Sequence, residues 1–135
     1  MNNKTFIPLA SLLAAMLVLP PAQAADTSIT EQLIRWNAQA SAPGNADRGK
    51  VFFSSKHGAD WSCASCHGTP PTSQGKHAST GKAIAALAPA FNPQAFTETA
   101  KVDKWLRRNC KDVLSRECSA NEKADVLAYL NSLKP

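Results

Sequence analysis

The chain contains the segment Cys63-Ala64-Ser65-Cys66-His67, in which two thiols are separated by two residues and followed at once by an imidazole. This C-x-x-C-H spacing is typical of covalent haem attachment. The thiols add across the two vinyl groups of the porphyrin, and the adjacent histidine reaches the iron as its proximal ligand. The sequence therefore predicts one covalently attached haem c, held by Cys63, Cys66 and His67.

Two other kinds of site also use closely spaced cysteines. A redox-active C-x-x-C dithiol normally follows a strand of a parallel sheet, and the sequence has no pattern of that kind. A zinc site needs two further ligands, and the remaining cysteines, Cys110 and Cys118, have an irregular spacing for that purpose. Haem attachment is therefore the favoured interpretation.

The second axial position of the iron decides what such a protein does. Electron-transfer cytochromes c usually fill it with a methionine. Here Met1 and Met16 are the only methionines, and both lie in the N-terminal apolar stretch. Unless the position stays open, the side chains left to fill it are His57, His77, Asn109, Cys110, Tyr129 or a lysine.

The two remaining histidines differ in their distance along the chain from the haem motif. His57 lies six residues before Cys63, too close to the attachment segment to cross the ring. His77 follows His67 by ten residues, in a loop long enough to carry it around the haem edge. Either histidine could equally be a solvated surface residue.

Asn109 lies 42 residues beyond His67, far enough along the chain to reach the opposite face of the ring. A carboxamide oxygen is a weak ligand that suits ferric iron better than ferrous iron, so reduction would tend to release it. An asparagine near a helix end is more often a cap, and the residues alone leave this alternative open.

The elements that position these residues are predicted to be helices. A capping box at Ser28 begins one helix, which ends at Pro43-Gly44. A second helix runs from about Asn45 to Gly58. We expect a loop over 68–80 and a short helix over 82–88.

The C-terminal part of the chain is also predicted to be helical. One helix covers about 99–108 and leads into Asn109 and Cys110. The last helix begins at a capping box and carries an apolar stripe, formed by Ser119 and Glu122 and by Val126, Leu127, Leu130 and Leu133. No alternating strand pattern is present, so the predicted fold class is all-α.

Residues 1–24 have the features of a secretory signal peptide. Lys4 supplies the positive start, residues 6–19 form an apolar run, and Ala22-Gln23-Ala24 predicts cleavage after Ala24. The run is shorter than the roughly twenty residues that a membrane anchor needs. We therefore expect a periplasmic protein that does not span the membrane once mature. Residues 25–135 would form a single domain, with an N-terminal extension helix over 25–43 and a haem core over 45–135.

The charge pattern bears on partners. Lys4 is the only charged residue in 1–24, so the formal net charge falls from +5 to +4 over 25–135. Basic residues are interleaved with acidic ones, which does not predict nucleic-acid binding. Between Lys101 and Lys111, however, three more basic residues are opposed by Asp103 alone. This patch could steer an acidic electron donor or an anion, or it could be a solvated helix face.

The early and late helices carry a second pattern. Gly49 and Phe53 on the first, with Tyr129 and Leu130 on the second, resemble the class I cytochromes c. In that family a glycine lets the two helices cross closely beside an aromatic pair. A glycine within a helix costs about 1 kcal/mol relative to alanine, which by itself indicates a packing role.

Five further segments carry a more specific pattern. They are Gly81-Lys82, Leu87-Ala88-Pro89, Lys101-Val102-Asp103-Lys104-Trp105-Leu106-Arg107-Arg108-Asn109-Cys110, Glu117-Cys118 and Glu122-Lys123-Ala124-Asp125. Together they resemble the oxygen-binding class I cytochromes c of the sphaeroides haem protein (SHP) type. The likeness covers nearly all of 25–135, and W-L-x-R-N-C with a cysteine eight residues later is its most specific part.

The resemblance implies a set of functional properties. Asn109 is the distal ligand, His67 is the proximal ligand, and Cys110 and Cys118 form a disulfide. Such a bond would stabilise by roughly 2.5 kcal/mol on the chain-entropy estimate and would keep a thiolate off the iron. The family further implies that the asparagine leaves on reduction and that O2 and NO bind to ferrous haem. A diheme cytochrome c and a membrane b-type cytochrome are the implied electron donors.

Two functions follow from these observations. We expect a periplasmic monohaem cytochrome c that receives electrons and binds O2 or NO. The alternative is a closed six-coordinate electron carrier with no role in gas binding, ligated for example by His77. Catalysis of O2 or NO chemistry would need a positioned proton donor, which the sequence does not select, so enzymatic activity stays open.

Overall fold

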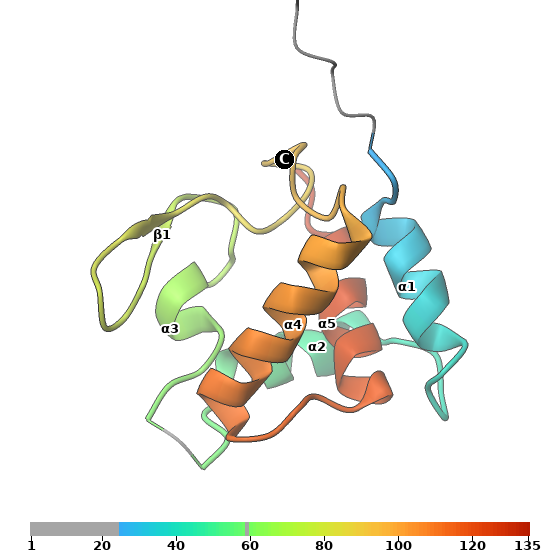
Figure 1. The fold of residues 1–135 in the computed structure, drawn as a ribbon, viewed down its shortest axis with the longest axis horizontal. Coiled ribbons are helices and arrows are strands. Elements are labelled where there is room, and N and C mark those ends of the chain that lie inside the picture. The colour runs from blue at the N-terminus through green and yellow to red at the C-terminus, as the bar shows by residue number, and fades with distance from the viewer. Residues whose placement is uncertain (1–24, 59) are drawn as a thin grey trace, which may run out of the picture.

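The computed structural model describes residues 25–58 and 60–135. The expected signal peptide, 1–24, lies outside them. The described chain is mainly helical (Figure 1). Its elements are α1 Ile29–Asn37, α2 Ala46–Ser54, α3 Ala64–His67, β1 Gly75–Lys76, β2 Ala83–Ile84, α4 Thr99–Leu114 and α5 Ala120–Ser132. No helix in these residues combines the length and the apolar composition needed to cross a membrane.

The core forms where α2 crosses α5. Phe53, Leu127 and Leu130 are almost fully buried there, and the rings of Phe53 and Tyr129 lie 5.6 Å apart. Gly49 makes the crossing close, because a Cβ at this position would lie 2.9 Å from the Cβ of Tyr129. The predicted role of this glycine is confirmed.

The predicted side-chain caps begin α1 and α5, but only α5 has the complete capping box. Ser28 accepts a hydrogen bond from the Glu31 backbone N–H at 3.3 Å, and Ser119 and Glu122 form the complete capping box of α5. The helix α1 is shorter than expected, because it ends at Asn37 rather than near Gly44. The Asn37 side chain then accepts a hydrogen bond from the Gly44 N–H at 2.8 Å, which fixes the loop that follows.

The short helix predicted over 82–88 is wrong. Residues 83–84 instead form β2, which pairs antiparallel with β1 in the register Gly75↔Ile84. The backbone N–H groups of Leu87 and Ala88 both donate to the carbonyl of Pro71, at 3.1 and 3.0 Å. In a local helix these N–H groups would donate to carbonyls four residues earlier in the chain. Here they donate to Pro71 instead, so the helix does not form.

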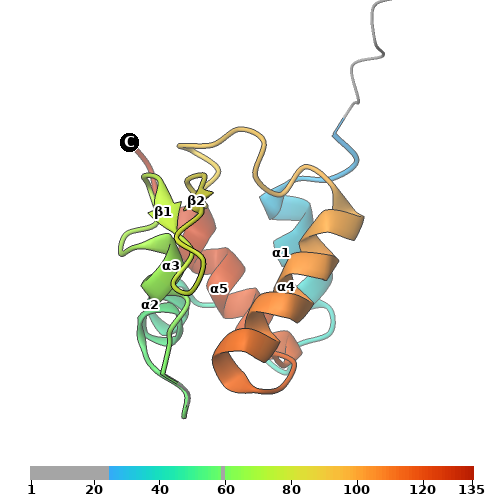
Figure 2. The same ribbon diagram turned by 60° about the vertical axis from the view of Figure 1, so that its left-hand side comes forward.

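Helix α4 is longer than expected, because it continues past residue 108 to Leu114 and ends at Ser115 in the left-handed region, at φ 59°. Asn109 and Cys110 therefore lie within the helix and not after it. In both views the start of α4 lies near α1 and apart from α3 (Figure 1, Figure 2). At its start, Asp26 accepts a hydrogen bond from the Thr99 N–H at 2.7 Å.

Candidate haem site

The attachment motif folds as a single helical turn. The backbone N–H of His67 donates to the carbonyl of Cys63 at 3.1 Å, and that of Cys66 donates to the same carbonyl at 3.3 Å. Ser62 and Ser65 cap the turn reciprocally, with bonds of 2.9 and 3.2 Å. Since residues three apart lie on one side of a helix, Cys63 and Cys66 face the same way.

Both motif cysteines are free and half-buried. Burial raises the pKa of Cys63 to about 11. No group of three metal-binding side chains occurs in the described residues, so the zinc alternative has no ligand set there.

His67 presents one ring nitrogen to the protein interior. Its Nδ1 atom is buried without a hydrogen-bond partner among the described residues. The ring lies 6.2 Å from that of Phe53. Burial lowers the pKa of His67. The imidazole is therefore neutral at pH 7, which is the form that binds iron.

The β1–β2 hairpin packs beside the attachment motif. The sequence pattern did not predict this hairpin. The Ala78 N–H donates to Cys66 Sγ at 3.3 Å, and a Cβ at Gly75 would lie 3.1 Å from His67 Cα. A glycine in a stretch already rich in Gly, Pro, Ser and Thr gave no distinct signal. The hairpin holds the backbone of the attachment turn in place.

Neither of the other histidines has both ring nitrogens free. His57 stacks on Phe52, with ring centroids 4.3 Å apart, and its Nε2 donates to the Phe52 carbonyl at 2.7 Å. His77 lies at the hairpin, where its Nδ1 accepts from the Thr80 N–H at 3.3 Å. The hairpin contacts the Cys66 side of the motif.

Asn109 lies at the centre of the inward face of α4. It shares that face with Val102, Leu106 and Val113, which recur at helical spacing and are buried or half-buried. Asn109 is itself half-buried, and its side chain makes no hydrogen bond within the described residues. It is not a helix cap, because α4 continues for five further residues.

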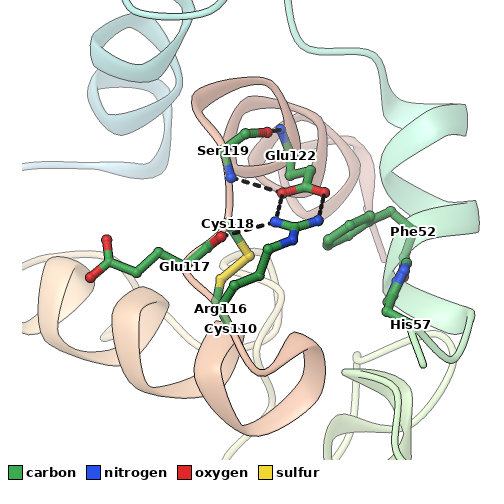
Figure 3. The surroundings of a disulfide bond; sticks show 8 residues. All are labelled: Phe52, His57, Cys110, Arg116, Glu117, Cys118, Ser119 and Glu122. Carbon is green, nitrogen blue, oxygen red and sulfur yellow. Dashed lines mark hydrogen bonds and ion pairs between the residues drawn. A yellow bond between two sulfur atoms is a disulfide. The ribbon is translucent and has the colours of Figure 1, made fainter. Parts of the chain in front are cut away.

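A disulfide joins Cys110 to Cys118, with their Cα atoms 5.5 Å apart (Figure 3). The two cysteines form a buried cluster with Val113 and Leu114, and the half-buried Cys63 packs against it. The second half of α4 therefore lies beside the first attachment cysteine. Because Cys110 is bonded to Cys118, its thiol is not available to iron.

Residues after α4 hold the disulfide loop shut. Arg116 binds both carboxylate oxygens of Glu122, at 2.8 and 2.7 Å (Figure 3). Glu122 also accepts from the Ser119 N–H at 2.8 Å. The hydrogen bonds from Arg116 are the largest cause that lowers the pKa of Glu122, to about 2.

Known proteins are similar to this chain in sequence and in fold. Residues 39–130 match a domain family described as a domain of unknown function, DUF1924. The chain is 43% identical over 123 residues to the cytochrome c-type protein SHP of Cereibacter sphaeroides, an alignment that covers 88% of this chain and 95% of that protein. This chain belongs to the SHP family of c-type cytochromes.

Solved structures confirm the cytochrome c fold of this SHP-family chain. The structure of oxidised SHP, described as an oxygen-binding cytochrome c, matches with a TM-score of 0.73 at 43% identity, covering 80% of this chain and 99% of that one. The crystal structure of oxidised cytochrome c'' from Methylophilus methylotrophus also has a TM-score of 0.73, at 32% identity over 79% of this chain and 95% of that one. A solution structure of cytochrome c'', which addresses haem-ligand detachment, has a TM-score of 0.65.

Membership of the SHP family implies a covalently held haem, and the residues fit that group. The motif offers two free thiols on one turn and an imidazole whose buried Nδ1 has no hydrogen-bond partner among the described residues. Helix α4 carries a polar side chain without a partner within its apolar face. Tyr129, by contrast, is buried in the core beside Phe53.

Proposed function

We propose that this SHP-family chain is a periplasmic monohaem cytochrome c that receives electrons and binds O2 or NO at ferrous haem after a weak ligand, Asn109, withdraws. Cys63 and Cys66 would hold the haem covalently. His67 would bind the iron on the side opposite Asn109. The description of SHP as an oxygen-binding cytochrome supports the gas ligand. The solution structure of cytochrome c'', described in terms of haem-ligand detachment, supports the withdrawal of the Asn109 ligand.

The observation that carries the proposal is the position of Asn109. A polar amide on the inward face of an amphipathic helix, without a protein hydrogen bond, lacks the partner that a half-buried amide normally has. Ferric haem iron would supply this partner. Within the described residues, no protein hydrogen bond would have to break for the amide to leave the iron.

The neighbouring residues keep this ligand weak. The disulfide removes the Cys110 thiol, which would bind iron more strongly than an amide. The apolar residues Val102, Leu106 and Val113 surround Asn109 on its face and limit access of water. Haem supplies the redox change and the open coordination site, and the chain supplies a ligand that binds only one oxidation state well.

The cellular setting belongs to the same proposal. Residues 1–24 would direct export and be removed after Ala24, leaving 25–135 as one domain with α1 as an extension of the haem core. A diheme cytochrome c and a membrane b-type cytochrome would supply electrons, as the family likeness suggests. Whether the bound gas is also turned over stays open.

The closed electron carrier finds less support. His77 is its best ligand, but the Nδ1 of His77 is occupied by Thr80, and its hairpin packs against the motif on the Cys66 side. His77 would have to leave this contact to bind iron, whereas the Asn109 side chain has no protein hydrogen bond to lose within the described residues. These contacts support Asn109 as the ligand.

Gas titration of the reduced holoprotein tests the proposed function. After reduction with dithionite, we expect a high-spin ferrous spectrum that converts on addition of NO and, once excess reductant is removed, of O2. A ferrous protein that is low-spin and does not respond to either gas would support the closed carrier and contradict the proposal.

A further inference from the structure

Helix α4 carries a strip of basic side chains beside one exposed tryptophan. Lys104, Arg108 and Lys111 recur at helical spacing and are all exposed. Their strip lies on the side of the helix away from Val102 and Val113. Trp105 lies at the edge of the strip, on the side nearer Asn109, and is 43% exposed. We call these four residues the α4 face.

The charges of the α4 face have no acidic partner. Elsewhere on this helix, Lys101 pairs with Glu98 at 3.3 Å and Arg107 with Glu117 at 3.9 Å. The ion pairs of the described residues include none from Lys104, Arg108 or Lys111. Asp112, the one exposed acid within α4, forms no ion pair with them either.

This helix also holds most of the net charge of the domain. Residues 99–114 contain five basic and two acidic side chains, a net charge of +3, whereas residues 25–135 together have a formal charge of +4. The positive field is therefore concentrated on one helix. A concentrated field of this kind raises the association rate of an oppositely charged partner.

Trp105 gives the α4 face an apolar surface. The Lys104 ammonium lies 5.7 Å from the ring centroid, and the Arg108 guanidinium carbon lies 5.5 Å from it. A large exposed aromatic side chain flanked by two cations has the composition of a protein-binding surface, in which tryptophan and arginine contribute most of the affinity. A face that only bound small anions would not need the indole.

The α4 face lies on the helix that carries the candidate distal ligand. Trp105 and Asn109 are four residues apart, so their side chains are neighbours along the helix. A protein seated on Trp105 would therefore lie one helical turn from the residue that the proposed function places over the iron. This gives the face a direct connection to electron entry.

We propose that the α4 face is the docking surface for an electron-donating protein whose own surface is acidic. The inference rests on the proposed function, because it names the partner that supplies the electron. Docking through charge would make complex formation fast and sensitive to salt. Trp105 would then be covered in the complex.

Charge-reversal variants with a matched control test this surface. One variant carries Lys104→Glu, Arg108→Glu and Lys111→Glu. The control carries Lys50→Glu, Lys76→Glu and Lys82→Glu, three exposed lysines without ion pairs on α2 and the hairpin. Both variants change the net charge by the same amount. A difference in their binding therefore reports where on the surface the reversed charges lie. Trp105→Ala is a third variant that leaves the charge unchanged.

The probe is a plant-type ferredoxin, which is an acidic electron-transfer protein. Stopped-flow measurement gives the rate at which photoreduced ferredoxin reduces the ferric holoprotein at low ionic strength. Calorimetry with oxidised ferredoxin gives binding without electron transfer. We expect the α4 variant to lose at least about tenfold in both the rate and the affinity, and Trp105→Ala to lose affinity with little change in salt dependence.

Three results would overturn the proposal. They are equal losses in the control and the α4 variant, a larger loss in the control, and an α4 variant that keeps its ferredoxin affinity while losing sedimentation with vesicles of anionic phosphatidylglycerol. The last would assign the face to a membrane surface. Gas binding by the dithionite-reduced variants is read separately, so failure of the docking surface and failure of the proposed function give different results.

Discussion

Arg35 and Asp103 join the N-terminal extension to the helix that carries Asn109. The two terminal nitrogens of Arg35, on α1, each donate to one carboxylate oxygen of Asp103, on α4. Asp26 caps the same helix at Thr99, and the disulfide holds its other end. Helix α4 is thus anchored at both ends, which fixes where its inward face points.

Removing this two-bond ion pair should loosen α4. We expect Arg35→Ala to lower the free energy of unfolding of the holoprotein by about 1 kcal/mol, because a bidentate pair exceeds the median exposed one. Lys101→Ala, which breaks the exposed pair with Glu98, is the matched control and should have almost no effect. Equal losses in urea titrations of the two variants would count against the anchoring role.

The disulfide should stabilise the domain. It closes a loop of eight residues in sequence separation, and we expect Cys110→Ala with Cys118→Ala to lower the free energy of unfolding by roughly 2.5 kcal/mol. When the wild-type protein is unfolded under strong reductant, its free energy of unfolding should fall by nearly the same amount. A double variant as stable as the oxidised protein would contradict the assignment of this stabilisation to the crosslink.

Glu122 should make stability depend on pH in acid. Its hydrogen bonds from Arg116 lower its pKa from 4.5 to about 2 in the folded protein. The stabilisation is complete above the unfolded pKa and is lost as the pH falls from about 4.5 to about 2. The wild-type protein should therefore have a higher free energy of unfolding than Glu122→Gln above about pH 4.5, and this difference should disappear as the pH falls to about 2. A difference in stability that does not change with pH would contradict this.

Much of the fold could be predicted because its signals are local. The side-chain cap at Ser28 and the capping box at Ser119 involve residues three apart, and the C-x-x-C-H motif is contiguous. Gly49 was also informative, since a glycine within an apolar helix has few explanations besides close packing. These features required no knowledge of the distant parts of the chain.

The parts that were missed depend on long-range contacts. The strands β1 and β2 have two residues each and form where Gly75 packs against the motif, so no alternating pattern marks them. The end of α4 was placed too early because Asn109 and Cys110 favour caps and breaks. The helix in fact ends at Ser115, whose φ of 59° is unusual for serine. Only the full length of α4 places Asn109 on its inward face.

The helix crossing offers a test of the core. A methyl group at residue 49 would meet the Asp125 backbone and lie 2.9 Å from Tyr129 Cβ. We expect Gly49→Ala to lower the free energy of unfolding by about 1–3 kcal/mol through overpacking. Lys50→Ala, at the exposed neighbouring position, should change it little. A neutral Gly49→Ala variant would show that α2 and α5 can separate at no cost.

The ferric absorption spectrum of Asn109→Ala tests the central claim most directly. If the Asn109 amide is the distal ligand, the variant should lose the low-spin six-coordinate spectrum while keeping wild-type far-ultraviolet circular dichroism, and His77→Ala should leave the spectrum unchanged. A ferric spectrum that is unaltered in Asn109→Ala, or lost in His77→Ala, would contradict the account.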